Sequence, residues 1–467
     1  MSMFEVPRRA PRRAIGALLM TAACAHVPST APTAPRRVPA ALIAATAPPQ
    51  VVAWIDLPSL DHGLDGAAAF VGTFPLPPLD VAHLDLAVGG LIGGAPTGLR
   101  VDRPVRLLVA MEPGAADAAY ALVGTIGDAA ALPAGRHARG EALAIVGPRP
   151  LLDAAAPWAL ASYARATPPS LPTLHVVPEA AYRQAGRALL AGMASGIAEA
   201  GDQAVAAPLG AAFQAAVVAT MAEASAIDVR LDATGARLRL DLDVTARPGT
   251  ALARFFAAQR PVAPALASRI TAPHDGAAVV ARLRVGPYRA AVGAGVARWL
   301  RTLRPELSAG DVGAVVDGLG ATLTGDVAIG DGVMLLGLTD APRARALFED
   351  DAELAVLADA LIIPSDADSP AFGQAIAVAT GADADAAWPS WPSAALARVA
   401  ASGPSLIAIW DVSSWGFTRP GLGDPIITAT ATFAGDRLRL HLDASPVAGW
   451  SAFAAFAARQ TAAVAAR

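Results

Sequence analysis

The 467-residue chain contains no lysine, no asparagine and a single cysteine, Cys24. The lack of lysine excludes a Schiff-base enzyme and a phosphate loop that depends on lysine. The lack of asparagine excludes an Asn-linked glycan. A single cysteine excludes an internal disulfide framework, a cysteine-based zinc site and an iron–sulfur cluster. Because lysine and asparagine both have AT-rich codons, their absence indicates a GC-rich genome.

The sequence motifs of several common enzyme classes are missing as well. The chain has no His-Glu-x-x-His zinc motif, no Gly-x-Ser-x-Gly nucleophile elbow and no complete glycine-rich phosphate loop. Asp80, His83 and Asp85 are the closest approach to a metal-binding cluster, and they also fit the polar face of a strand. No pair of carboxylates suited to acid–base catalysis can be identified. We therefore expect no metal and no cofactor.

Charge is scarce, and apolar residues are abundant. Hydrophobic residues make up 54% of the chain, charged residues make up 16%, and the formal net charge is -4. Such a chain can bury large cores. Beyond residue 40 there is no basic patch of the kind that binds nucleic acid, so a nucleic-acid partner is not expected.

The N-terminus has the organisation of a signal peptide. Four arginines between Arg8 and Arg13 precede an apolar segment, Ile15–Ala23, that is too short to span a bilayer. The sequence Thr-Ala-Ala-Cys then ends at Cys24. This segment resembles the lipobox of bacterial lipoproteins, in which small residues precede a lipidated cysteine. The resemblance covers residues 1–24 and implies cleavage after residue 23, lipidation of Cys24 and attachment to a membrane.

Residues 24–49 are expected to form a flexible tether between the lipid and the folded body. Proline, alanine, threonine and serine dominate this segment, and proline favours extended backbone over helix. No aspartate follows Cys24 to signal retention in the inner membrane. The resemblance to lipoproteins therefore implies delivery to the outer membrane of the cell envelope.

An internal repeat is the clearest signal in the body of the chain. Residues 235–259 align without a gap with residues 435–459, at an offset of 200, and eleven positions are identical. In the first copy, apolar and charged residues alternate on both sides of a glycine turn, which predicts an antiparallel hairpin. Its solvent-facing side carries arginine and aspartate, which can pair across strands. A helix is expected to follow from residue 250 onward.

The starts of two modules also match each other. Residues 51–57 resemble residues 279–285, and in each case a proline and an amphipathic helix follow the expected strand. We therefore predict an α+β fold with two tandem modules of antiparallel sheet and packed helices, residues 50–262 and 275–465, joined by a linker over residues 261–276. Further strands are expected at residues 105–111, 142–146, 321–329, 333–338 and 375–379.

The first module is expected to contain an additional pair of helices that begin at Pro178 and Pro208. Residues 204–221 carry no charge, so a membrane span is one interpretation of this segment. Pro208 and Gln214 interrupt it, and alanine contributes little transfer energy. A buried helical hairpin is therefore the favoured interpretation.

Three classes of function stay open at this stage. Residues 98–105 and 324–328 resemble segments of uncharacterised envelope proteins of GC-rich bacteria, a resemblance that implies no activity. The chain could be a non-catalytic protein that binds an envelope protein, a lipid or a glycan, a lipid-carrying protein, or a hydrolase with acidic residues that no motif reveals. The missing catalytic motifs favour binding or a structural role.

Two tryptophans are the candidate ligand-binding residues of the body. Trp388 and Trp391 stand in a Trp-Pro-Ser-Trp-Pro sequence that could present two rings to a sugar or a peptide. In an alanine-rich chain, large rings are also needed to fill the core, and this is the alternative explanation.

Overall fold

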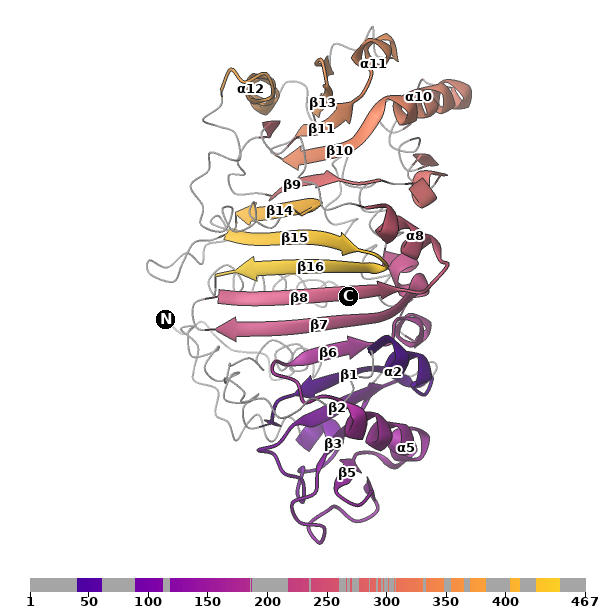
Figure 1. Cartoon of the computed structure of the whole chain (residues 1–467), viewed down its shortest axis with the longest axis vertical. Coiled ribbons are helices and arrows are strands. Elements are labelled where there is room, and N and C mark those ends of the chain that lie inside the picture. Colours follow the sequence, from indigo (N-terminus) through magenta and orange to yellow (C-terminus); the bar gives the residue numbers. More distant parts are fainter. Residues whose placement is uncertain are drawn as a thin grey trace, which may run out of the picture. The chain divides into compact units, whose positions relative to one another are not determined.

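The computed structural model in Figure 1 combines helices with a large antiparallel sheet, which confirms the α+β class. It describes residues 40–60, 89–111, 118–184, 217–234, 237–259, 277–284, 286–290, 308–330, 333–347, 354–364, 370–383, 404–411 and 426–445, with a few single residues between these ranges.

The chain divides into two compact units. Unit 1 comprises residues 1–184, 228–241 and 449–467, and unit 2 comprises residues 185–227 and 242–448. Two neighbouring strands therefore contribute residues to both units. The module boundaries expected from the sequence stay predictions.

Unit 1 is built on an antiparallel sheet with the strand order β4-β5-β3-β2-β1-β6-β7. Strand β8 follows β7 in the chain and lies next to it in the sheet. Helix α5 packs against β3 and β5, and helix α2 packs against β6. The elements are α2 (Ala40–Thr46), β1 (Val51–Leu57), β2 (Val105–Ala110), β3 (Ala119–Thr125), β4 (His137–Arg139), β5 (Leu143–Val146), α5 (Arg149–Arg165), β6 (Thr173–Val176), β7 (Ala224–Thr234) and β8 (Arg237–Ala246).

Unit 2 has the strand order β12-β13-β11-β10-β9-β14-β15-β16. Its first seven places are filled by the seven strands β9 to β15. If the strands of each unit are numbered along the chain, these places repeat the order of unit 1. The elements are α8 (Ala251–Ala258), β9 (Ala277–Arg282), η2 (Gly286–Tyr288), α10 (Ala309–Thr322), β10 (Leu323–Gly330), β11 (Val333–Leu338), α11 (Ala341–Leu347), β12 (Ala355–Val356), β13 (Ala360–Pro364), α12 (Pro370–Ala379), β14 (Leu406–Asp411), β15 (Ile426–Ala434) and β16 (Arg437–Ala444).

Strand β13 shows how helices cover both faces of the sheet in unit 2. Successive side chains of a strand point to opposite faces. Leu361 and Ile363 belong to a core cluster with residues of α10 and α11. Ala360 and Ile362 belong to a second cluster, which includes Ala375 of α12. A strand buried on both faces reads as a continuous apolar run and shows no alternation.

Most of the predicted strands are confirmed, and one is wrong. Strands β2, β5, β10 and β11 lie where the sequence places them. Residues 375–379 were expected to form a strand and instead end helix α12, which begins at Pro370. Proline is well suited to the first turn of a helix, and alanine is the strongest helix former. A short apolar run does not by itself distinguish a strand from a buried helix.

The end of the expected tether is also helical. Residues 40–46 form α2, in which Ile43 and Ala44 are buried. Pro39 and Pro48 flank this stretch, and the residues between them are mainly good helix formers. The rest of the expected tether, residues 24–39, lies outside the described residues.

Both expected hairpins of the internal repeat are present. Strands β7 and β8 form the first hairpin, and β15 and β16 form the second, about 200 residues later. Helix α8 follows the first hairpin, and the Thr250 side chain caps it by accepting a hydrogen bond from the Ala253 amide. The helix expected after the second hairpin lies outside the described residues. Arg439 and Asp243 pair between β16 and β8, at 2.8 Å.

The additional helical pair of the first module is described only at its ends. Residues 178–184 and 217–223 are helical, while most of the uncharged segment at 204–221 lies outside the described residues. Among the helices that the structure describes, none has the length and apolar character required to cross a membrane.

Candidate functional site

Two neighbouring strands of unit 1 each carry one charged residue in an otherwise apolar run. Asp56 is the charged residue of β1 and Arg106 is that of β2, and the antiparallel register places them opposite each other. Arg106 donates from Nε to Asp56 Oδ1 at 2.6 Å and from Nη2 to Oδ2 at 2.8 Å. The side chains are 1% and 11% exposed. This is a buried, bidentate ion pair.

Helix α5 and two aromatic rings complete the surroundings of the Arg106 guanidinium. Its Nη1 donates to Ser162 Oγ at 2.9 Å, and Ser162 donates in turn to the Ala159 carbonyl. The Cζ atom lies 5.4 Å from the Trp54 ring centroid and 5.7 Å from that of Tyr163. Both rings lie within the range of a cation–π interaction. The buried cation is therefore held by an anion, a hydroxyl group and two rings.

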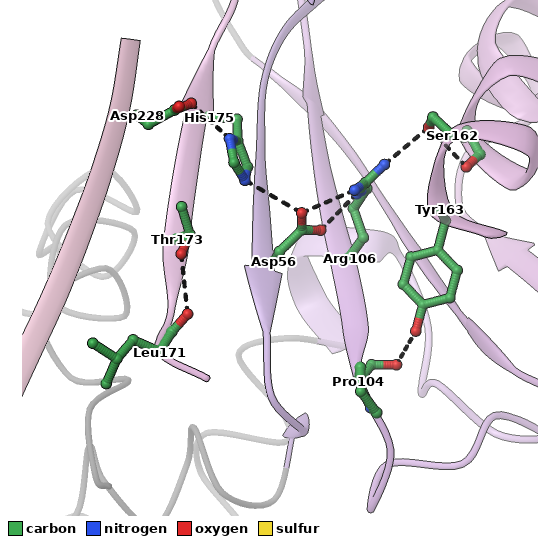
Figure 2. A network of polar contacts seen from close by, with 10 residues as sticks. Asp56, Pro104, Arg106, Ser162, Tyr163, Leu171, Thr173, His175 and Asp228 are labelled. Atoms are coloured by element: carbon green, nitrogen blue, oxygen red, sulfur yellow. Dashed lines mark hydrogen bonds and ion pairs between the residues drawn. The ribbon is translucent and has the colours of Figure 1, made fainter. Parts of the chain in front are cut away.

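His175 extends this arrangement across β6 to β7, as Figure 2 shows. Its Nε2 lies 3.3 Å from Asp56 Oδ2, and its Nδ1 lies 2.7 Å from Asp228 Oδ1. The imidazole stacks on Trp54 with a centroid distance of 5.1 Å and an interplanar angle of 23°. We call Asp56, Arg106, Ser162, His175 and Asp228 the ion-pair network.

The contacts within the ion-pair network favour the charged forms of His175 and Asp56. Burial alone would lower the pKa of His175, but hydrogen bonds to Asp228 and Asp56 outweigh it and raise this pKa to about 9. Burial alone would raise the pKa of Asp56, but hydrogen bonds from His175 and Arg106, together with their charges, hold it below its usual value. At neutral pH His175 is therefore an imidazolium between two carboxylates, and the network has no net charge.

The saturation of the Asp56 carboxylate limits what the network can do chemically. One oxygen accepts from Arg106, and the other accepts from both Arg106 and His175. A carboxylate that is fully paired and held ionised is a poor general base and a poor general acid. The ion-pair network links side chains of strands β2, β1, β6 and β7 and of helix α5.

An open cleft of about 600 Å³ lies beside the network in unit 1. Asp56 contributes to its lining, together with Arg100 and Arg103 and residues near the C-terminal end of α5. Tyr163 also lines the cleft, and its hydroxyl donates to the Pro104 carbonyl. Burial, with a further contribution from the Asp56 charge, raises the pKa of Tyr163 to about 12, so the phenol stays neutral. The volume is within the range of small-molecule sites.

Unit 2 carries a related ion pair with the two charges exchanged between the strands. Arg282 of β9 lies opposite Asp326 of β10, and Arg282 Nε lies 3.3 Å from Asp326 Oδ1. Two residues earlier in β9, Val280 lies opposite Ile407 of β14. Counted from the ion pair, the same places in unit 1 are held by Trp54 and His175. In the sequence match of residues 51–57 with residues 279–285, Asp56 aligns with Arg284 instead.

The corresponding positions of unit 2 therefore lack the histidine. A pair is present in both units, whereas the imidazolium bridge belongs to unit 1.

The site residues predicted from the sequence fall on parts of the chain that the structure does not describe. Cys24, Trp388 and Trp391 lie outside the described residues, and so do Asp80 and His83. Within the described part of the chain, no group of three or more histidine, cysteine or carboxylate side chains is placed to hold a metal ion.

The ion-pair network itself was not predicted. A single charge in each of two apolar strands is a signal that could have indicated Asp56 and Arg106. No local pattern indicates His175 or Asp228, because the contact between them depends on β6 lying between β1 and β7.

Comparison with protein-family models, curated proteins and solved structures finds no match for this chain.

Proposed function

We propose that this chain is a lipid-anchored protein of the bacterial cell envelope that binds a small ligand in the cleft of unit 1 without catalysis. The observation that carries this proposal is the cleft itself. It is large enough for a small molecule, and the carboxylate in its lining, Asp56, has both oxygens occupied. A pre-formed, partly apolar cleft on a rigid scaffold is typical of a binding site.

The two alternative functions have less support. A hydrolase of the acid–base type would need two facing carboxylates, and the described lining of the cleft contains one, Asp56. A lipid-carrying protein would need a large enclosed apolar cavity, whereas this cleft is open and bordered by Arg100 and Arg103. Binding of a small ligand fits both observations.

The proposed attachment depends on Cys24 and on the short segment between it and the folded body. Helix α2 begins at Ala40 and packs against β6, so the tether would join the folded part of unit 1 at this helix. Residues 25–39 would span at most about 50 Å when fully extended. The start of helix α2 would then lie within about 50 Å of the membrane surface.

The anchor is tested by Cys24→Ala expressed in a GC-rich Gram-negative host. We expect that the lipoprotein pathway does not cleave the signal peptide of this variant or attach a lipid to it. The variant should therefore be missing from the outer-membrane fraction. Cell fractionation and the intact mass of the purified protein measure both effects. His26→Ala is the matched control and should fractionate as the wild type does. Unchanged mass and membrane fractionation of Cys24→Ala would contradict lipidation.

Binding in the cleft is tested by a variant that fills it. Ala164 is exposed on α5 and lines the cleft, so Ala164→Trp should occupy the space without disturbing the core. With the fluorescent probe 1-anilinonaphthalene-8-sulfonate we expect saturable binding to the wild type and about tenfold weaker binding to Ala164→Trp. Ala161→Trp, an exposed position of α5 outside the described lining, is the control. Equal binding by all three proteins would contradict a site in the cleft.

We also propose that the body arose by tandem duplication. Support comes from the matching strand orders, from the 200-residue offset of the two hairpins and from the ion pairs in matching strands. In this proposal the second copy keeps the pair, Arg282 and Asp326, but lacks the histidine bridge. The ligand-binding role is assigned to the first copy, where His175 completes the network.

A further inference from the structure

The charges around the cleft indicate which ligands it accepts, if the proposed binding function is correct. We infer that the ligand is a small amphiphile with one anionic group, a carboxylate, phosphate or sulfonate, which binds to Arg100 and Arg103 while its apolar part lies against the proline-rich wall. The inference rests on the distribution of charge, of hydrogen-bonding groups and of apolar surface in the described lining.

The lining of the cleft keeps one uncompensated positive charge, because Arg100 and Arg103 share one neighbouring carboxylate, whereas its own carboxylate is fully neutralised. Arg100 and Arg103 line the cleft, and their side chains are 44% and 59% exposed. Asp102 pairs with Arg100 at 2.7 Å and lies 3.9 Å from Arg103, but it is not part of the described lining. Asp56, the acidic residue of that lining, is neutralised by Arg106. The cleft therefore presents a net positive charge.

Arg100 is also oriented for an anion. Its Nε and Nη2 donate to the two oxygens of Asp102, at 3.1 Å and 2.7 Å. This bidentate pair fixes the guanidinium plane, and in the described part of the chain Nη1 makes no further hydrogen bond. A planar guanidinium with a remaining donor is well suited to a carboxylate or phosphate oxygen. Arg103 adds a second, loosely held cation.

The rest of the lining is mainly apolar and includes three residues with hydroxyl groups, Thr125, Tyr163 and Thr167. Pro104, Pro168 and Pro169 are rigid residues of the lining, and the Tyr163 ring lies beside them. The Thr167 hydroxyl oxygen is shielded from solvent and has no hydrogen-bond partner. The lining therefore suits a molecule that is mainly apolar and carries a polar end.

The experiment compares two probes that share an aromatic body. 1-Anilinonaphthalene-8-sulfonate carries a sulfonate, and N-phenyl-1-naphthylamine is its uncharged counterpart. We expect the double variant Arg100→Gln with Arg103→Gln to bind the sulfonate about tenfold more weakly and the uncharged probe with unchanged affinity. Arg149→Gln, an exposed arginine of α5 outside the described lining, should bind both probes as the wild type does.

The outcomes separate the ligand class from the binding function. If both probes bind and Ala164→Trp blocks them, but the arginine variant binds the sulfonate normally, the anionic class is wrong and the binding function stands. If neither probe binds, or Ala164→Trp has no effect, the binding function in the cleft is wrong. In competition, octyl phosphate should displace the sulfonate probe and inorganic phosphate should not. If octyl phosphate and inorganic phosphate displaced the sulfonate probe equally well, the inference that the ligand is an amphiphile would be wrong.

Discussion

Arg106→Met should lower the free energy of unfolding by about 3–5 kcal/mol. Methionine approximates the length of arginine and avoids a large cavity. The substitution removes both hydrogen bonds to Asp56 and the donor to Ser162, and it leaves a buried carboxylate with His175 as its remaining cation. The uncompensated charge is the main cost.

Urea unfolding, followed by tryptophan fluorescence and near-ultraviolet circular dichroism, measures this loss. Trp54 and Trp158 are in edge-to-face contact at 5.5 Å next to the network, so they report on unit 1. Arg106→Lys keeps a charge but loses the bidentate geometry, and we expect an intermediate loss. Arg149→Met removes an exposed pair and should change stability little. A loss with Arg106→Met as small as that of the control would show that the buried pair does not stabilise the fold.

Alkaline pH should destabilise the protein through His175. The pKa of this imidazole is about 9 in the folded protein and 6.5 in its ordinary state. Its contribution to stability is therefore complete below pH 6.5, declines as the pH rises, and is lost above about pH 9. At about 1.4 kcal/mol per pKa unit, the difference corresponds to a loss of about 3 kcal/mol. The cause is the loss of the imidazolium between Asp56 and Asp228.

The measurement is the free energy of unfolding between pH 6 and pH 10, in the wild type and in His175→Gln. We expect the wild type to lose stability steadily between pH 6.5 and pH 9, and we expect His175→Gln to lack this decline. His137→Gln, on β4 outside the network, should keep the wild-type slope. Parallel curves for the wild type and His175→Gln would mean that the imidazolium contributes nothing.

The local patterns of the sequence predict the fold well where one face of a helix or strand is exposed to solvent. Alternation in residues 227–244 indicates a hairpin, and its repeat 200 residues later indicates a second hairpin; both are present. The pattern fails where an element is buried on both sides, because period two disappears there. Residues 375–379 show a second failure, because a short apolar run is compatible with a strand and with the end of a partly buried helix.

The candidate site was much harder to predict, because it depends on contacts between distant parts of the chain. Asp56 and Arg106 are 50 residues apart, and His175 and Asp228 are 53 residues apart. Alternation places Asp228 on the solvent-facing side of a hairpin, where an aspartate needs no partner. Its partner is specified by the strand order, which brings β6 next to β7 and β1. Sequence periodicity contains no information about that order.

The exchanged charges of the two ion pairs have a consequence for how the chain avoids misassembly. Matching strands in a tandem repeat can pair with the wrong copy during folding, which is a characteristic failure of repeated domains. If β1 paired with β10 in the native register, Asp56 would lie opposite Asp326, and if β9 paired with β2, Arg282 would lie opposite Arg106. Each wrong pairing would place two like charges opposite each other, whereas each correct pairing joins opposite ones. If the body arose by duplication, as proposed, the polarity of the pair distinguishes the strands of one copy from those of the other.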